Sequence, residues 1–176
     1  MIMSNKVILW SILILPWLTL FFLKRREIKR YMPLALFTIV TASIIIESGI
    51  TLGLWSIRET VYPLNQTISY VYGLAPVVAV WVFRYSYGSF LRFIALDSVF
   101  NIVFAFFFIP WLVQKGIGDV YVSEMTVFLL AAALSFVLYA FQMWQDDIFV
   151  SAEKGLSRLR IRPMAAKPFP RDDGRS

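Results

Sequence analysis

A single acid inside a long apolar stretch is the first feature that could do chemistry. Residues 31–55 read YMPLALFTIVTASIIIESGITLGLW, and Glu47 is the only acidic or basic residue among them. An ionised carboxylate in a membrane costs about 3 kcal/mol unless it is paired, protonated or hydrated. We therefore predict that Glu47 binds a ligand or a proton. A protonated Glu47 that only holds helices together by a hydrogen bond is an equally supported alternative.

Polar residues at helical spacing extend this candidate site. Ser43, Glu47 and Thr51 stand at i, i+4 and i+8, so they share one helix face, which is expected to meet other helices or a cavity. Tyr72 and Ser135 fall at a similar depth in later apolar stretches, and they are the expected partners of Glu47.

Asp97 and Asn101 form a second polar pair, one helical turn apart near the start of a later apolar stretch. Arg84 and Arg92 lie close enough along the chain to pair with Asp97, and an ion pair in the headgroup zone is the preferred explanation. As an alternative, Asp97 and Asn101 line a vestibule that opens to the inner side.

The composition excludes several chemistries. The chain has no Cys and no His, so disulfides, thiolate or imidazole metal sites and histidine acid-base catalysis are ruled out. No nucleotide-binding loop is present, and neither a metal nor a cofactor is expected. An enzyme would need carboxylates, such as Asp97 with Asp146 or Asp147 and a divalent ion, acting on a lipid headgroup.

The apolar content specifies the elements that must position these residues. Of 176 residues, 59% are hydrophobic and only 16% are charged, and the mean hydropathy is +0.70. Such a chain is expected to be an all-α integral membrane bundle. Residues 1–145 form its transmembrane domain, with five helices predicted at about 7–23, 32–55, 64–83, 93–113 and 125–144. Pro16, Gly73 and Pro76 are expected to bend their helices.

The basic residues predict the orientation. Five Lys and Arg residues occupy 24–30, two occupy 84–92 and seven follow Trp144, whereas only Lys6, Arg58 and Lys115 fall on the other side. The positive-inside rule then places the N-terminus outside and the C-terminus in the cytoplasm. Because these cations flank apolar runs, anionic lipid headgroups are the expected partner, and nucleic acid is not.

Two further segments could bind membrane or protein. Residues 146–162 of the tail show an amphipathic helical stripe before a disordered end, although a solvated basic stub is nearly as well supported. The membrane-surface residues of this stripe are Lys154, Arg158, Arg160 and Arg162. Gly49 and Gly53 form a GxxxG motif, which indicates close packing inside the bundle or, alternatively, a homodimer seam.

Several sequence stretches resemble a group of known proteins. LPWLTLFFL, IKRYMP, ESGITLGLW and YGLAPVVAVWVFRYSYGSF together resemble small multi-pass membrane proteins of unassigned function from spore-forming Firmicutes. The resemblance covers most of the chain except the tail. It implies a multi-pass protein of the bacterial plasma membrane, and it carries no catalytic or ligand residues across.

These observations favour a non-enzymatic membrane component that binds a partner protein or a lipid. A small proton-coupled transporter, with Glu47 as the proton carrier, is the second hypothesis. A lipid-modifying enzyme is the third, because the acids it needs are scattered along the chain.

Overall fold

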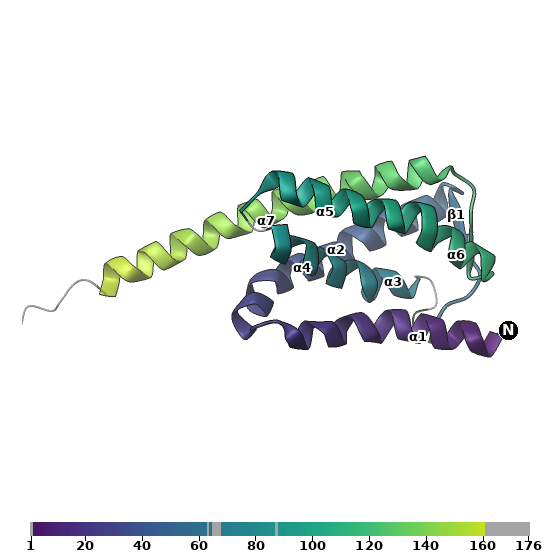
Figure 1. The fold of residues 1–176 in the computed structure, drawn as a ribbon, viewed down its shortest axis with the longest axis horizontal. Coiled ribbons are helices and arrows are strands. Elements are labelled where there is room, and N and C mark those ends of the chain that lie inside the picture. Colours follow the sequence, from purple (N-terminus) through teal and green to yellow (C-terminus); the bar gives the residue numbers. More distant parts are fainter. Residues whose placement is uncertain (1, 63, 65–67, 87, 161–176) are drawn as a thin grey trace, which may run out of the picture. The chain divides into compact units, whose positions relative to one another are not determined.

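The structure is a computed structural model that describes residues 2–62, 64, 68–86 and 88–160, with side chains described from Asn5 to Asp147. Its contacts divide the chain into two compact units, residues 1–141 and residues 142–176. The described residues are mostly helical, as predicted, and a short two-stranded ribbon accompanies the helices (Figure 1).

Nine helical segments make up the described chain. Their bounds are α1 Ile2–Thr19, the 3₁₀ turn η1 Leu20–Phe22, α2 Arg25–Thr51, α3 Ser69–Tyr72, α4 Leu74–Ser86, α5 Phe90–Val103, the π-helical turn η2 Phe104–Phe108, α6 Ile109–Gln114 and α7 Glu124–Arg160. Four stretches are long and apolar enough to cross a membrane, namely Asn5–Phe22, Arg25–Thr51, Phe90–Gln114 and Glu124–Asp147.

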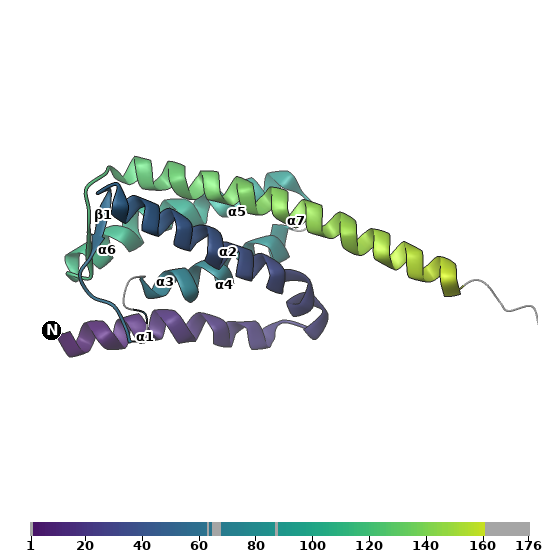
Figure 2. The same ribbon diagram turned by 180° about the vertical axis from the view of Figure 1, so that it is seen from behind.

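The predicted third span, 64–83, differs from these four. It forms two shorter helices, α3 and α4, that meet at Gly73. Together they pack against α1, α2 and α5 and occupy the interior of the first unit (Figures 1 and 2). Buried residues therefore run along the whole segment rather than along one face.

Two prolines explain the contact between α1 and this broken segment. Pro76 has no N–H to donate to the Tyr72 carbonyl four residues earlier, and Trp17 Nε1 donates to that oxygen instead at 2.8 Å. Pro16 likewise deprives the Ile12 carbonyl of its helical donor. This oxygen faces Gly73 so closely that an added Cβ there would lie 2.1 Å from it. Only glycine fits at this crossing.

Helix α2 has an identifiable start, end and inner face. The Lys24 backbone N–H donates to Glu27 Oε2 at 3.0 Å, which fixes its first turn. At its end Gly53 has φ +71°, and the N–H of Leu54 donates to the Gly49 carbonyl, so the helix stops in a Schellman motif. Its buried residues share one helix face, mostly three or four positions apart: Tyr31, Leu34, Ala35, Thr38, Ala42, Ile46 and Gly49.

The ribbon joins two segments that were predicted to be loops on the same side. Strand β1, Trp55–Ile57, pairs antiparallel with β2, Gly118–Val120. Arg58 forms an ion pair with Asp119 beside the ribbon, and Asn5 Nδ2 donates to the Lys115 carbonyl at 2.9 Å. The loops are thus held together at one end of the helices.

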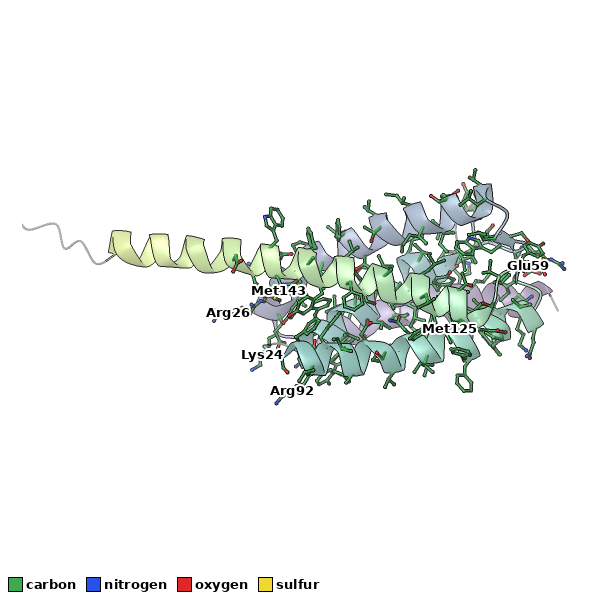
Figure 3. All side chains as sticks on the ribbon, turned by 90° about the horizontal axis from the view of Figure 1, so that it is seen from above. Lys24, Arg26, Glu59, Arg92, Met125 and Met143 are labelled. Atoms are coloured by element: carbon green, nitrogen blue, oxygen red, sulfur yellow. The ribbon has the colours of Figure 1, made fainter. Side chains whose placement is uncertain are left out.

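The opposite end carries the predicted basic clusters. Lys24, Arg26 and Arg92 gather there, far from Glu59 (Figure 3). Arg84 Nε lies 3.3 Å from Glu27 Oε1, so this ion pair connects α4 to the start of α2.

Helix α7 is continuous where two helices, 125–144 and 146–162, were predicted. It runs from Glu124 to Arg160 with no break at Gln145, and no proline or glycine occurs there to interrupt it. In the second unit, Gln142 Nε2 donates to Asp146 Oδ1 at 3.0 Å. The side chains of Lys154, Arg158 and Arg160, and all of Arg162, lie outside the described residues.

Candidate functional site

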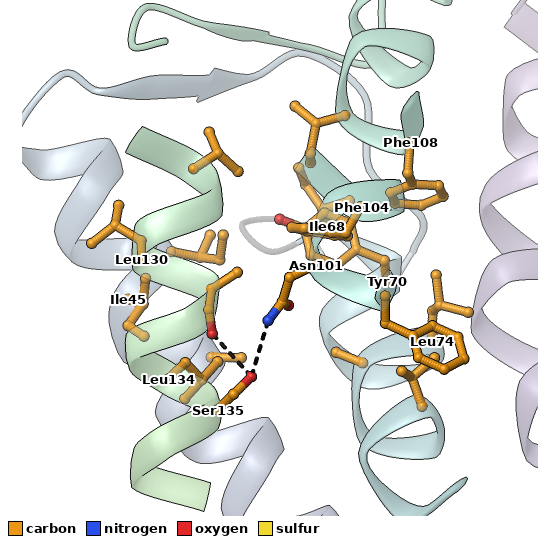
Figure 4. A pocket seen from close by; sticks show the side chains of 18 of the residues that line it. Ile45, Ile68, Tyr70, Leu74, Asn101, Phe104, Phe108, Leu130, Leu134 and Ser135 are labelled. Atoms are coloured by element: carbon orange, nitrogen blue, oxygen red, sulfur yellow. Dashed lines mark hydrogen bonds between the residues drawn. The ribbon is translucent and has the colours of Figure 1, made fainter. Parts of the chain in front are cut away.

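A cavity of about 390 Å³ runs through the first unit between α2, α3, α4, α5, η2, α6 and α7. Most of its lining is apolar, and Figure 4 shows Ile45, Leu74, Leu130 and Leu134 around it. At one end Trp55, Gly118 and Val120 of the ribbon line it.

Aromatic side chains line and support the other end of the cavity. Phe83 and Phe93 belong to its wall, and both are almost fully buried. Their ring centroids are 4.9 Å apart, and the Tyr139 ring packs 4.8 Å from that of Phe93. Tilted aromatic pairs of this kind add stability beyond the area that they bury.

The π-helical turn η2 shapes the wall nearest the ribbon. Pro110 cannot donate to the Phe106 carbonyl, and the preceding turn widens so that the Ile109 N–H donates to the Phe104 carbonyl, five residues back. Phe104 and Phe108 both line the cavity, and Tyr70 meets their rings edge-on at 5.4 and 5.8 Å. A π turn beside a cavity is a frequent feature of functional sites.

Three polar side chains from two helices meet on the cavity wall. Asn101 Nδ2 on α5 donates to Asp97 Oδ2 at 2.7 Å and to Ser135 Oγ on α7 at 3.3 Å. Ser135 Oγ also donates to the Ala131 carbonyl at 3.1 Å, and Figure 4 shows this hydroxyl bridging toward Asn101. We call Asp97, Asn101 and Ser135 the polar cluster.

The polar cluster presents acceptors rather than donors. The amide nitrogen of Asn101 uses its two hydrogens on Asp97 and Ser135, and this orientation follows from the carboxylate that it contacts. The Asn101 amide contacts only one of the two Asp97 oxygens, and among the hydrogen bonds of the cluster none ends at the Asn101 carbonyl oxygen or at the second Asp97 oxygen. A molecule in the cavity would therefore have to donate.

Some residues that line the cavity also contribute to the outer surface of α5 and α7. Phe100 and Val103 line it and are still 42% and 49% exposed, and Leu130 across from them is 36% exposed. Because these residues belong both to the lining and to the outer surface, we infer that the cavity opens between α5 and α7, and we call this opening the mouth. The mouth is apolar on both sides.

The structure places the predicted Glu47 row elsewhere. Glu47 and Thr51 lie on the exposed face of α2, and Thr51 Oγ1 donates to the Glu47 backbone carbonyl at 2.9 Å. We expected this row to face other helices or a cavity. The inner face of α2 instead carries Ala42, Ile46 and Gly49, and Glu47 is about 100° around the helix from Ile46.

Glu47 also lies closer to the end of its helix than predicted. Helix α2 ends at Thr51 rather than at residue 55, so Glu47 stands only four residues, roughly 6 Å, from its end. The Ser43 hydroxyl is buried with no hydrogen-bond partner among the described residues. The expected partner Ser135 joins the polar cluster instead, and at Tyr72 the only described side-chain contact of this kind is the hydrogen bond from Trp17 to its backbone carbonyl.

Asp97 lies deeper than predicted and has different neighbours. Because α5 begins at Phe90 instead of residue 93, Asp97 is seven residues, roughly 10 Å, inside the helix. Neither expected ion pair is seen among the described residues, since Arg84 is paired with Glu27 and no ion pair joins Arg92 to Asp97. The predicted face shared by Asp97 and Asn101 is present, and it lines the cavity.

The two glycines of the GxxxG motif have roles within the chain. A Cβ on Gly49 would lie 1.8 Å from the Trp55 ring, which packs against this helix and donates from Nε1 to the Ile46 carbonyl at 3.0 Å. Gly53 supplies the positive φ that ends α2. The close packing predicted for the motif is therefore found at Gly49, with a side chain of the same molecule.

Sequence reasoning did not find the cavity, although small residues gave a signal for it. Ala42, Ala75, Ala79 and Ala131 all contribute to its wall, from α2, α4 and α7. Within the described part of the chain, no group of three His, Cys, Asp or Glu residues could hold a metal ion. No protein-family model, curated protein or solved structure matches the chain.

Proposed function

We propose that this protein is an integral membrane protein that binds one hydrocarbon chain of a membrane lipid in the cavity between α2, α4, α5 and α7. The observation that carries the proposal is an apolar cavity whose lining includes exposed side chains of α5 and α7, two of the stretches long and apolar enough to cross a bilayer. A mouth in this position faces acyl chains rather than water. No catalytic step is part of the proposal.

The size of the cavity suits a single chain. Its volume of about 390 Å³ lies in the lower part of the range of roughly 300–1,000 Å³ that small-molecule pockets occupy. Transferring methylene groups from one apolar medium to another gains little by itself, so shape complementarity and dispersion contacts must provide the affinity.

The outer surface of the helices supports a lipid environment. Large apolar side chains are exposed along α2, α5, η2 and α7, including Val40, Ile44, Val99, Phe107, Leu129 and Phe136. A protein in water rarely exposes apolar patches of this extent, whereas a bilayer solvates them. We place the protein in a bacterial plasma membrane, with the α3–α4 segment as the fifth crossing.

The orientation can be tested directly because the chain has no cysteine of its own. We propose that the ribbon end lies outside and that the end with Lys24 and Arg92 lies in the cytoplasm, beside anionic headgroups. Tyr62→Cys should react with a membrane-impermeant maleimide in intact cells, because Tyr62 is 82% exposed. Arg92→Cys should react only after permeabilisation. The reverse pattern would invert the topology.

The cavity itself is tested by filling it. Ala131 on α7 lines the cavity, whereas Ala133, two residues on, is exposed and lines none of it. The purified protein in nanodiscs would be labelled with a lipid that carries a photoactivatable group on its acyl chain, and the labelled residues mapped.

We expect labelling at Leu130, Leu134 or Phe104 in the unmodified protein. Ala131→Leu should reduce it severalfold, because the added atoms occupy the cavity, and Ala133→Leu should not. Equal labelling of the two variants at the lining residues would refute an internal lipid site.

A further inference from the structure

We propose that the polar cluster of Asp97, Asn101 and Ser135 recognises a protonated amine on an amphiphilic ligand whose hydrocarbon tail fills the cavity. This inference rests on the proposed function, because it assigns the head group of the molecule that the cavity takes. It defines the ligand as a lipophilic ammonium compound that retains at least one N–H.

The charge of Asp97 is the first step. The side chains around its carboxylate, the Asn101 amide and the Ser135 hydroxyl, are both neutral. Of the two cations expected to pair with it, Arg84 forms an ion pair with Glu27, and the described residues show no ion pair between Arg92 and Asp97. A carboxylate on an apolar wall is stabilised most by an opposite charge that also hydrogen-bonds. An ammonium group supplies both.

The hydrogen-bond polarity of the cluster is the second step. The hydrogen-bond acceptors still available to a ligand are the Asn101 carbonyl oxygen and one Asp97 oxygen. No donor is available on Asn101, because both of its amide hydrogens already donate to Asp97 and Ser135. An ammonium with N–H groups satisfies both oxygens. A phosphate or carboxylate head would place acceptor against acceptor, and a quaternary ammonium would bring charge without a donor.

The length of the cavity is the third step. Leu112 on α6 also lines it, fifteen residues beyond Asp97 along nearly continuous helix, which corresponds to roughly 22 Å. A head group at Asp97 therefore leaves room for an extended tail that points toward the ribbon. The mouth at Phe100 and Val103 lies next to the polar cluster on the same helix, so the charged head has only a short path to it.

The test compares three ligands that share one tail. Full-length protein in phosphatidylcholine nanodiscs would be labelled with a photoactivatable alkyl probe, and hexadecylamine, hexadecanol and hexadecyltrimethylammonium would compete for the site. The choline head carries no N–H, so the bilayer itself does not compete for the cluster. We expect the amine to displace the probe at a concentration at least tenfold below that of either other compound.

Substitutions test whether the polar cluster causes the preference for the amine. Asp97→Asn should abolish the tenfold preference while the alkyl probe still labels the cavity, and Asp97→Glu should restore part of it. Asp147→Asn is the matched control, because Asp147 is an exposed acid that lines none of the cavity. It should leave the preference unchanged.

The outcomes separate the two proposals. Equal displacement by the three compounds in the unmodified protein, or a preference that survives Asp97→Asn, would overturn amine recognition while leaving the hydrocarbon site in place. Failure of the alkyl probe to label the lining residues of the unmodified protein would instead overturn the proposed function, and amine recognition with it. If Asp97→Asn does not fold, loss of the preference in Asp97→Glu alongside normal probe labelling would also count against amine recognition.

Discussion

The hydrogen bond from Trp17 to the Tyr72 carbonyl should contribute more to stability than an ordinary contact between membrane helices. Hydrogen bonds between transmembrane helices average about 0.6 kcal/mol, since each partner finds another when the bond is broken. The Tyr72 carbonyl has no alternative donor in the folded helix. Its normal helical donor would be the N–H of residue 76, and Pro76 has none. An acceptor left unsatisfied away from water costs about 1–3 kcal/mol.

We therefore expect Trp17→Phe to lower the free energy of unfolding by about 1–3 kcal/mol. Trp10→Phe is the matched control on the same helix, because Trp10 is 43% exposed and donates no hydrogen bond that the structure describes. Unfolding by sodium dodecyl sulfate in mixed micelles, followed by far-ultraviolet circular dichroism, measures both variants without depending on tryptophan fluorescence.

A second substitution isolates the backbone carbonyl from the lost indole ring. Pro76→Ala restores an N–H four residues after Tyr72, so the carbonyl gains an alternative donor. Trp17→Phe should then cost at least about 1 kcal/mol less in the Pro76→Ala background than in the unmodified protein. The reasoning fails if Trp17→Phe is no more costly than Trp10→Phe. It fails equally if the cost is the same in both backgrounds.

Three further predictions concern the fold and the predicted acid. Gly73→Ala should destabilise the protein by about 1–3 kcal/mol, because its Cβ would collide with the α1 backbone. Gly53→Ala, which meets no atom within 4 Å, should cost only about 1 kcal/mol for its positive φ; equal unfolding midpoints in detergent would contradict the close crossing at Gly73. A double-mutant cycle of Arg58→Ala and Asp119→Ala should give a coupling of about 1 kcal/mol or less that falls with added salt, since the Arg58 side chain is 63% exposed, and a larger, salt-independent value would mean a buried pair. Glu47→Gln should leave photolabelling of the cavity unchanged, because Glu47 does not line it. Loss of both the labelling and solute flux in vesicles would instead support the transporter hypothesis, in which Glu47 carries the proton.

The long apolar helices could be predicted from the sequence because their signal is local. Runs of apolar residues bounded by charges mark the four long helices, and Gly73 and Pro76 mark the break in the remaining one. Their ends are less well predicted, since α2 begins at Arg25 instead of residue 32 and α7 continues past residue 144 to Arg160. The two loops at the ribbon end were placed on the same side from charge alone, and their pairing agrees with that placement.

The rotation of each helix was harder to predict, because several faces of a membrane helix are apolar. On α2 the row of Ser43, Glu47 and Thr51 competed with the row of Ala42, Ile46 and Gly49 for the inner face. Polarity suggested the first row, and packing selects the second, whose small residues admit the Trp55 ring and leave space for the cavity. The polar cluster could not be paired from sequence because Asn101 and Ser135 are 34 residues apart and depend on those rotations.

The break at Gly73 has a consequence for how the chain is made. A ribosome completes α1 and α2 before α3 and α4 emerge, and the central segment is too short and too interrupted to settle in lipid unaided. The Tyr72 carbonyl in this segment can accept the hydrogen bond from Trp17 only if α1 is still beside the insertion site. For the membrane placement proposed above, we therefore expect biogenesis to hold early segments near the translocon until the middle of the chain arrives, instead of releasing each helix as it is completed.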